Sequence, residues 1–168
     1  MKTLLIVYHS MTGGTMQLAR AAAAGAAAVA ARESGRLQIR CQLAAATGPT
    51  EVLAADAYVF ATPENLAAMA GIMKDFFDRC YYAALQRIEG RPYAIIVCAG
   101  SDGTNAVRQI ERIALGWRLK AVAPARIVCT HAQTAEEIAR PKTIGTADLD
   151  EAEALGTALA EGLLLGIY

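Results

Sequence analysis

The fold is decided by one stretch near the start of the chain, Leu4-Leu5-Ile6-Val7-Tyr8-His9-Ser10-Met11-Thr12-Gly13-Gly14-Thr15. Its first five residues are an unbroken apolar run, which is typical of a central parallel strand covered on both faces. Hydroxyls and glycines follow, and an Ala-rich helical pattern begins at Thr15. A strand, a tight loop and a helix start in this order predict a phosphate site. Glycine lets backbone N–H groups turn inward, and the helix N-terminus adds partial positive charge.

The side chains of this loop indicate which phosphate it binds. Ser10, Thr12 and Thr15 supply hydroxyl donors. The loop contains no Lys or Arg, and the Gly-Lys-Ser/Thr signature of triphosphate sites is absent. The loop therefore favours a monophosphate held by neutral donors over a triphosphate with Mg²⁺.

Composition narrows the class of protein. The 168 residues are 55% hydrophobic and carry 16 basic and 16 acidic side chains, for a formal net charge of +0. We expect one domain over residues 1–168, with a sizeable core and no nucleic-acid partner. The four cysteines form no C-x-x-C pair, which indicates reduced thiols in a cytoplasmic protein. No segment has the apolar length of a membrane span, and the histidines and cysteines show no metal-ligand spacing.

Apolar strands alternate with helical patterns along the whole chain. Strands are expected at residues 3–8, 37–43, 57–61 and 93–98, with a fifth interrupted at Pro124 and resuming over 126–131. Helices are expected at residues 15–32, 69–85, around 107–117, and from 148 to about 165, where Asp148 with Glu151 resembles a capping box. Residues 47–49 are expected to be a turn, and residues 132–147 a polar loop. This alternation predicts a doubly wound α/β fold. In such a sheet the ligand lies beyond the carboxyl ends of the strands, where residues 10–15, 62–66 and 99–103 form turn-rich loops.

Two blocks resemble the flavodoxin-like FMN-binding family. Ser10-x-Thr12-Gly13-x-Thr15 is similar to the family's phosphate loop, S/T-x-T-G-x-T. Residues 57–63, AYVFATP, followed by residues 69–78, MAGIMKDFFD, resemble its second signature and are closest to the tryptophan-repressor-binding-protein type of NAD(P)H:quinone oxidoreductase. The resemblance implies a five-stranded parallel sheet in the order 2-1-3-4-5 with helices on both faces. It also implies FMN as cofactor and NADH or NADPH as co-substrate.

The same resemblance implies two groups of cofactor-binding residues. The phosphate loop is Ser10, Met11, Thr12, Gly13, Gly14 and Thr15. The flavin ring lies between Thr62, Pro63, Glu64, Asn65 and Leu66 on one side and Ala99, Gly100, Ser101, Asp102 and Gly103 on the other. His131 is the candidate catalytic residue, as a proton donor at the same edge of the sheet. The alternative interpretation is a partly exposed histidine at a strand end with no chemical role.

The function indicated is an FMN-dependent oxidoreductase that passes electrons from NAD(P)H to a quinone or similar small acceptor. The alternatives are a flavodoxin-type electron carrier and a scaffold without cofactor. Electron-carrier flavodoxins are typically acidic and stack the ring between aromatic side chains, whereas this chain is neutral and its two ring loops contain no Trp, Tyr or Phe. Both departures favour the enzyme. Tyr81-Tyr82 and residues 163–168 belong either to the core or to the contact patch of a homo-oligomer.

Overall fold

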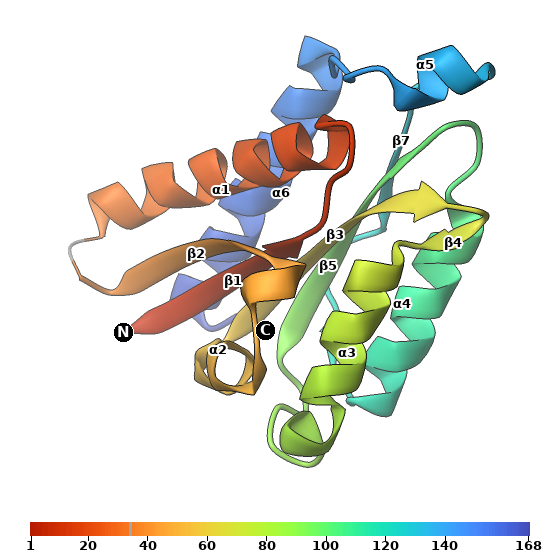
Figure 1. Ribbon diagram of the computed structural model, residues 1–168. Coiled ribbons are helices and arrows are strands. Elements are labelled where there is room, and N and C mark those ends of the chain that lie inside the picture. Colours follow the sequence, from red (N-terminus) through yellow and green to blue (C-terminus); the bar gives the residue numbers. More distant parts are fainter. Residues whose placement is uncertain (34) are drawn as a thin grey trace.

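The computed structural model describes residues 1–33 and 35–168 and has a parallel sheet at its centre (Figure 1). The strands are β1 (Lys2–Tyr8), β2 (Leu37–Leu43), β3 (Ala57–Asn65), β5 (Pro92–Ala99), β6 (Lys120–Ala121) and β7 (Arg126–Cys129). Their order is β2-β1-β3-β5-β6, and β7 also pairs with β5 in parallel. This confirms the predicted order, with β5 as the fourth strand and the interrupted pair β6–β7 as the fifth.

The central position of β1 follows from its apolar run. Ile6 pairs with Cys41 of β2 on one side and with Val59 of β3 on the other. Because side chains alternate along a strand, Leu5 and Val7 enter the core on one face of the sheet, while Leu4 and Ile6 enter the core on the other. Both faces of the strand are therefore buried, and polar residues begin only where the strand ends.

Helices cover both faces, as predicted. The pair α1 (Gly14–Arg32) and α6 (Thr146–Leu165) packs on one face, and α2 (Pro49–Ala54), α3 (Gly71–Ala84) and α4 (Thr104–Gly116) pack on the other (Figure 1). Small residues let α1 and α6 cross in contact: a Cβ on Gly156 would overlap the backbone oxygen of Ala22, and one on Gly25 would overlap that of Glu153. The small-residue stripe of α1 thus faces α6 as well as the sheet.

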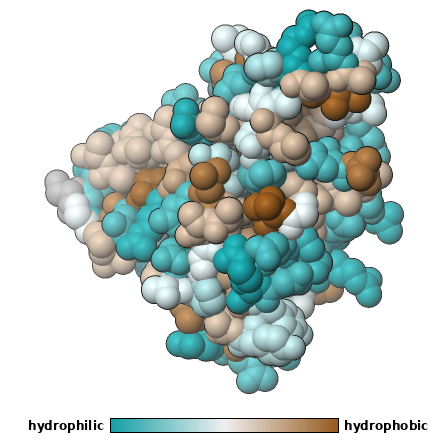
Figure 2. Space-filling model, in the orientation of Figure 1, coloured by the Kyte–Doolittle hydropathy of each residue, from teal (hydrophilic) through white to brown (hydrophobic). Residues whose placement is uncertain are grey.

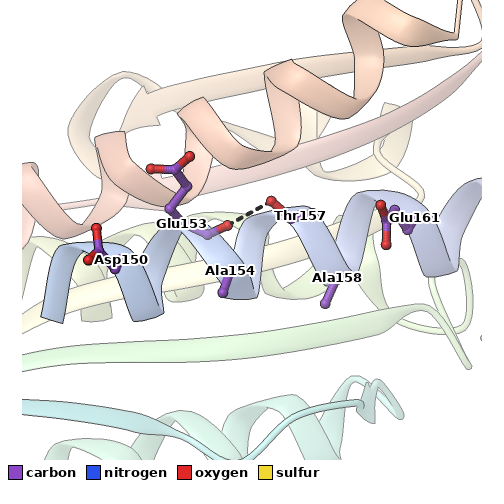
Figure 3. Close-up of a pocket in the computed structure, with 6 residues that line it drawn as sticks. All are labelled: Asp150, Glu153, Ala154, Thr157, Ala158 and Glu161. Carbon is purple, nitrogen blue, oxygen red and sulfur yellow. Dashed lines mark hydrogen bonds between the residues drawn. The ribbon is translucent and has the colours of Figure 1, made fainter. Parts of the chain in front are cut away.

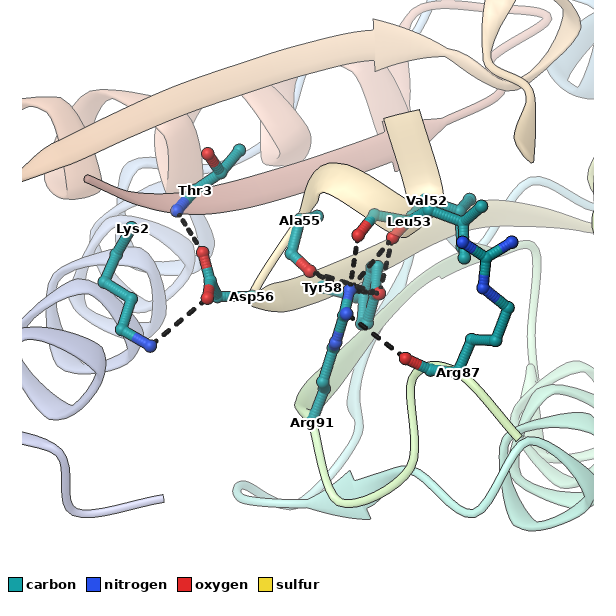
Figure 4. Close-up of polar contacts among 9 residues, drawn as sticks. All are labelled: Lys2, Thr3, Val52, Leu53, Ala55, Asp56, Tyr58, Arg87 and Arg91. Atoms are coloured by element: carbon teal, nitrogen blue, oxygen red, sulfur yellow. Dashed lines mark hydrogen bonds and ion pairs between the residues drawn. The ribbon is translucent and has the colours of Figure 1, made fainter. Parts of the chain in front are cut away.

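Arg91 ties together the amino end of the sheet (Figure 4). Its guanidinium donates to the three carbonyls that end α2, those of Val52, Leu53 and Ala55, and to the Tyr58 hydroxyl at 3.2 Å. A cation at this position also offsets the negative end of the helix dipole. This network stabilises the edge of the sheet opposite to the loops at the carboxyl ends.

Three local predictions were wrong. Residues 62–65 continue β3, which pairs with β4 (Ala68–Met69) as a hairpin rather than ending in a loop. The expected polar loop contains α5 (Ala135–Ala139), whose first turn is capped by Thr134 and Glu137. Helix α6 begins at Thr146, with Gly145 as N-cap, so Asp148 and Glu151 do not form the expected capping box. In addition, the short helices η1 (Ala44–Ala46) and α2 occupy residues around the predicted turn at 47–49.

Candidate functional site

A pocket of about 490 Å³ lies where the carboxyl ends of the central strands meet. Its volume lies within the range of roughly 300–1,000 Å³ that is usual for small-molecule sites. It spans the ends of β1 and β3, the point where the order of the strands reverses, which is where open α/β sheets bind ligands. The lining residues are Ser10, Met11, Thr12, Gly14, Thr15, Pro63, Glu64, Asn65, Cys98, Ala99, Gly100, Thr130, Ala132, Ile138, Ala139 and Lys142.

All three predicted loops reach this pocket. The predicted residues that do not line it are Gly13, Thr62, Leu66, Ser101, Asp102 and Gly103. His131 is exposed and lines a neighbouring hollow of about 340 Å³ with Arg140 and Glu137. Its backbone N–H donates to Gly100 at 2.8 Å, so the residue lies beside the pocket rather than in its wall.

The first loop is built to present N–H groups. Gly13 has a φ of +87°, and its N–H donates to Ser10 Oγ at 3.1 Å. The first hydrogen bond of α1 runs from Gln17 N to Gly13 O at 3.1 Å, so the N–H groups of Gly14, Thr15 and Met16 have no partner within the helix. Gly14 also leaves no room for a side chain, because a Cβ there would lie 2.7 Å from Cys98 Sγ.

Thr15 carries the clearest sign of a missing polar partner. The residue is 1% exposed, and its Oγ1 has no hydrogen-bond partner in the described part of the chain. Burying an unpaired hydroxyl costs about 1–3 kcal/mol, so such groups are rare without a functional reason. A hydroxyl at the start of a helix, on the wall of a pocket, is well suited to donate to an anion.

The fourth wall of the pocket was missed by sequence reasoning. Ile138, Ala139 and Lys142 reach it from α5 and the segment that follows. Lys142 N donates to Thr12 O at 2.8 Å, which joins this segment to the first loop. The Thr134-x-x-Glu137 capping pattern could have revealed α5, but no local signal places it over a loop more than a hundred residues away.

The ammonium of Lys142 does not serve as a free cation in the pocket. Its Nζ donates to the carbonyls of Glu137, Ile138 and Arg140 at 2.6, 2.9 and 2.6 Å. The lysine therefore closes the C-terminal end of α5, and the groups left for an anion are the neutral donors of the first loop.

The side of the pocket formed by the hairpin is held by hydrogen bonds between loops. Glu64 Oε2 accepts from the Gly103 N–H at 2.9 Å, which joins the β3–β4 hairpin to the loop after β5. The hairpin turns at Leu66 and Ala67, both with positive φ, at 50° and 58°. Non-glycine residues adopt this conformation at a cost, and Asn105 Nδ2 holds the turn by donating to Ala67 O at 2.6 Å. Leu66 is fully exposed and does not line the pocket.

Burial sets the chemistry of the one thiol in the pocket wall. It raises the pKa of Cys98 from 9.0 to about 11, with the nearby charge of Lys142 acting in the opposite direction. The thiol is therefore protonated near neutral pH and is a poor nucleophile. The charged residues that line the pocket are Glu64, whose carboxylate accepts from the Gly103 N–H, and Lys142, whose ammonium donates to three carbonyls. The site is therefore suited to binding and orienting a ligand rather than attacking it.

A second hollow, of about 580 Å³, lies along α6 (Figure 3). All of its lining residues come from this single helix, and three of them are carboxylates: Asp150, Glu153 and Glu161. Thr157 Oγ1 is already used, since it donates to Glu153 O at 3.0 Å. An acidic strip on one helix disfavours a phosphate ligand, so we place the candidate site at the carboxyl ends of the strands.

Comparison with known proteins agrees with this geometry. The family model described as NADPH-dependent FMN reductase matches residues 44–135, more than half of the chain. The chain belongs to this family. As a member it is an FMN-dependent oxidoreductase with NAD(P)H as its electron donor. The matched residues include the hairpin and the loop after β5, both of which contribute residues to the pocket wall.

Relatives and solved structures add to this assignment. The chain is 26% identical over 151 residues to an NAD(P)H dehydrogenase (quinone) of Archaeoglobus fulgidus, covering 75% of this chain and 79% of that protein. It superposes on a flavodoxin from the domain Archaea with a TM-score of 0.74 and 19% identity, covering 96% of this chain and 98% of that one. A flavodoxin, WrbA-like protein from Agrobacterium tumefaciens gives a TM-score of 0.73 at 19% identity, with 96% of each chain covered. The two structures show the shared fold.

The residues of the pocket fit FMN. The unpaired Thr15 hydroxyl and the free N–H groups at the start of α1 suit a phosphate, and the pocket is large enough for a flavin. Of the helices in residues 1–33 and 35–168, none combines the length and apolar composition that a bilayer crossing requires. On the face in Figure 2, strongly apolar side chains lie as separate spots among hydrophilic ones, and homo-oligomerisation stays a prediction.

Proposed function

We propose that the chain binds FMN with its phosphate at residues 10–15 and its ring between the β3–β4 hairpin and residues 99–103, and that it reduces a quinone or similar small acceptor. The observation that carries the proposal is the buried, unpaired Thr15 hydroxyl, which lines the pocket at the start of α1. Ser10, Thr12 and the first N–H groups of α1 are the other phosphate donors.

The protein residues hold the cofactor and shape its access. When bound, FMN would supply the chemistry of hydride and two-electron transfer between NAD(P)H and the acceptor, and the residues of the pocket would hold and orient it. Pro63, Glu64 and Asn65 form one wall for the ring, with Ala99 and Gly100 opposite. None of the residues that line the pocket is aromatic. This composition leaves a face of the ring open to a planar donor or acceptor, which supports turnover of small molecules.

Support for a quinone acceptor comes from two sources. The relative from Archaeoglobus fulgidus is named as a quinone dehydrogenase. The rim of the pocket also carries apolar side chains that are well exposed: Met11 at 73% and Ile138 at 57%. An apolar rim suits a lipophilic acceptor. An electron carrier that docks on a charged partner would instead gain from a strongly charged surface, and this chain has a formal net charge of +0.

His131 enters the proposal as a proton donor to the acceptor. Its place beside the pocket, held by the bond from its N–H to Gly100 O, puts it within the same cluster of loops. Replacement by Gln preserves a polar side chain and removes the transferable proton. If His131 supplies the proton, His131→Gln lowers quinone reduction without changing the rate at which NADPH reduces the bound flavin.

Two measurements on the purified protein test the function. Under anaerobic conditions, NADPH or NADH alone is expected to bleach the flavin absorbance, and addition of benzoquinone is expected to restore it and sustain nicotinamide oxidation. Bound FMN that neither nicotinamide reduces contradicts the enzyme assignment and supports the carrier. Flavin that is reduced by NAD(P)H but not reoxidised by quinones contradicts only the choice of acceptor.

A further inference from the structure

Gln17 makes an unusual set of contacts in the first turn of α1. Its Nε2 donates to Gly13 O at 3.0 Å and to Lys142 O at 2.7 Å. Its Oε1 accepts from the Ile144 N–H at 3.2 Å. The carboxamide thus uses both of its ends to join the phosphate loop to a segment more than a hundred residues away. The side chain is half-buried and does not line the pocket.

These contacts fix the direction of one peptide bond. The C=O and N–H of a trans peptide point in opposite directions. The Gly13 carbonyl accepts from the backbone N–H of Gln17 at 3.1 Å and from its side-chain Nε2 at 3.0 Å, so the side chain adds a second bond that holds this carbonyl. The N–H of Gly14 points the opposite way, and Gly14 lines the pocket. The Thr12 carbonyl accepts from the Lys142 N–H at 2.8 Å. Two carbonyl oxygens that would repel an anion are therefore held by hydrogen bonds within the protein.

We propose that Gln17 is a positioning residue for the phosphate of FMN, which it serves by orienting the Gly13–Gly14 peptide and by holding residues 142–144 against the loop. This inference rests on the placement of the phosphate in the proposed function. It differs from a general structural role because it predicts an effect on the phosphate alone. Riboflavin has the same ring and ribityl chain without the phosphate, so its binding does not depend on the Gly14 N–H.

The test compares FMN with riboflavin on two matched variants. Gln17→Met keeps the length of the side chain and removes its three hydrogen bonds, while the backbone bond from residue 17 to Gly13 O remains. Gln109→Met makes the same change at a half-buried glutamine whose Oε1 accepts the Met69 N–H at 2.9 Å and holds the hairpin at the ring end. Affinities are measured by quenching of flavin fluorescence. We expect Gln17→Met to weaken FMN by about tenfold and riboflavin by less than about twofold. Gln109→Met is expected to leave the ratio of the two affinities unchanged.

A second measurement needs no variant and decides the question if Gln17→Met does not fold. Amide hydrogen exchange of the wild-type chain is followed alone, with FMN and with riboflavin. FMN is expected to slow exchange at the Lys142 and Ile144 amides, because phosphate binding and these bonds stabilise the same loop conformation. Riboflavin is expected to leave both amides unchanged.

The outcomes separate the two proposals. If the wild-type chain binds FMN no more tightly than riboflavin, the phosphate placement in the proposed function is wrong. The wild-type chain can prefer FMN while Gln17→Met lowers the affinities for FMN and riboflavin equally, or lowers neither. In that case the positioning role of Gln17 is overturned and the proposed function stands. Equal protection of the Lys142 and Ile144 amides by both flavins also overturns it.

Discussion

Replacing Thr15 by Val is expected to make the protein more stable without flavin and worse at binding FMN. Val has nearly the shape of Thr, so the substitution removes the hydroxyl without opening a cavity. Thr15 is 1% exposed and its Oγ1 is unpaired within the described residues. An unpaired buried polar group costs about 1–3 kcal/mol, so its removal is expected to raise the free energy of unfolding by about 1–2 kcal/mol.

The effect on FMN has the opposite sign. A hydrogen bond to a charged group contributes about 1.5–3 kcal/mol, which corresponds to about a 10- to 150-fold loss of FMN affinity in Thr15→Val. Riboflavin affinity is expected to change little, since the ring end of the pocket is untouched. Urea denaturation of the flavin-free protein gives the stability, and titration of flavin fluorescence gives both affinities.

Thr47→Val is the matched control for this experiment. Thr47 is also 1% exposed, but its Oγ1 donates to Leu43 O at 2.8 Å. The same substitution there removes a hydrogen bond and is expected to lower the free energy of unfolding by about 1 kcal/mol. If Thr15→Val destabilises the flavin-free protein as much as Thr47→Val does, the Thr15 hydroxyl is not an unpaired group and the phosphate argument fails. Unchanged FMN affinity in Thr15→Val refutes it equally.

Three further outcomes follow from the site. Glu64→Gln keeps an acceptor for the Gly103 N–H but removes a negative charge beside the proposed ring position. The midpoint potential of bound FMN should therefore rise, by on the order of 1 kcal/mol in reduction free energy. A dye-coupled titration that shows no rise places the carboxylate away from the flavin. Burial raises the pKa of Cys80 and Cys98 from 9.0 to about 11. The two thiols lose their protons at lower pH in the unfolded chain than in the folded one. Urea denaturation should therefore show full stability below pH 9 and a loss of stability between about pH 9 and 11, of at most about 2–3 kcal/mol per thiol. This loss should be smaller in the variant that carries both Cys80→Ala and Cys98→Ala. The Lys142 ammonium is held by three carbonyls, so salt should have little effect on the binding of FMN. The dissociation constant of FMN should change by less than about threefold between roughly 0.05 and 0.5 M salt. A change of about tenfold would indicate a cation at the phosphate.

The layout of the fold was predictable because its signals are local. The apolar run of β1 predicts burial on both faces, and the structure places Leu4–Val7 at 0% exposure. The glycines before α1 predict the left-handed turn found at Gly13. The strand order follows once a doubly wound sheet is recognised. The interruption of the fifth strand at Pro124 was also predicted correctly, since β6 and β7 lie on either side of this residue.

The errors came where distant contacts decide local structure. The turn at Leu66 and Ala67 has no glycine or asparagine, so nothing in its composition indicates a tight hairpin with positive φ. It forms because Asn105 and Gln109 on α4 bind the hairpin backbone. Residues 138–142 likewise read as a polar loop. Their place in the pocket depends on hydrogen bonds between residues 142–144 and the start of α1 with the loop before it. The hydrophobic periodicity of the sequence carries no information about such distant contacts.

In the proposed site a phosphate is bound by neutral donors, because the Lys142 ammonium in the pocket wall already donates to three carbonyls. A lysine or arginine would bind the dianion through charge, and it would also bind other anions. Here the Lys142 N–H takes up the carbonyl of Thr12, Gln17 takes up that of Gly13, and the Lys142 ammonium takes up the carbonyls at the end of α5. What remains toward the pocket is a set of N–H and hydroxyl donors, whose direction, rather than net charge, selects the ligand. Lys142 belongs to both groups, because its N–H holds the Thr12 carbonyl and the residue lines the fourth wall. We therefore expect the affinity for phosphate and the shape of the pocket to depend on shared hydrogen bonds.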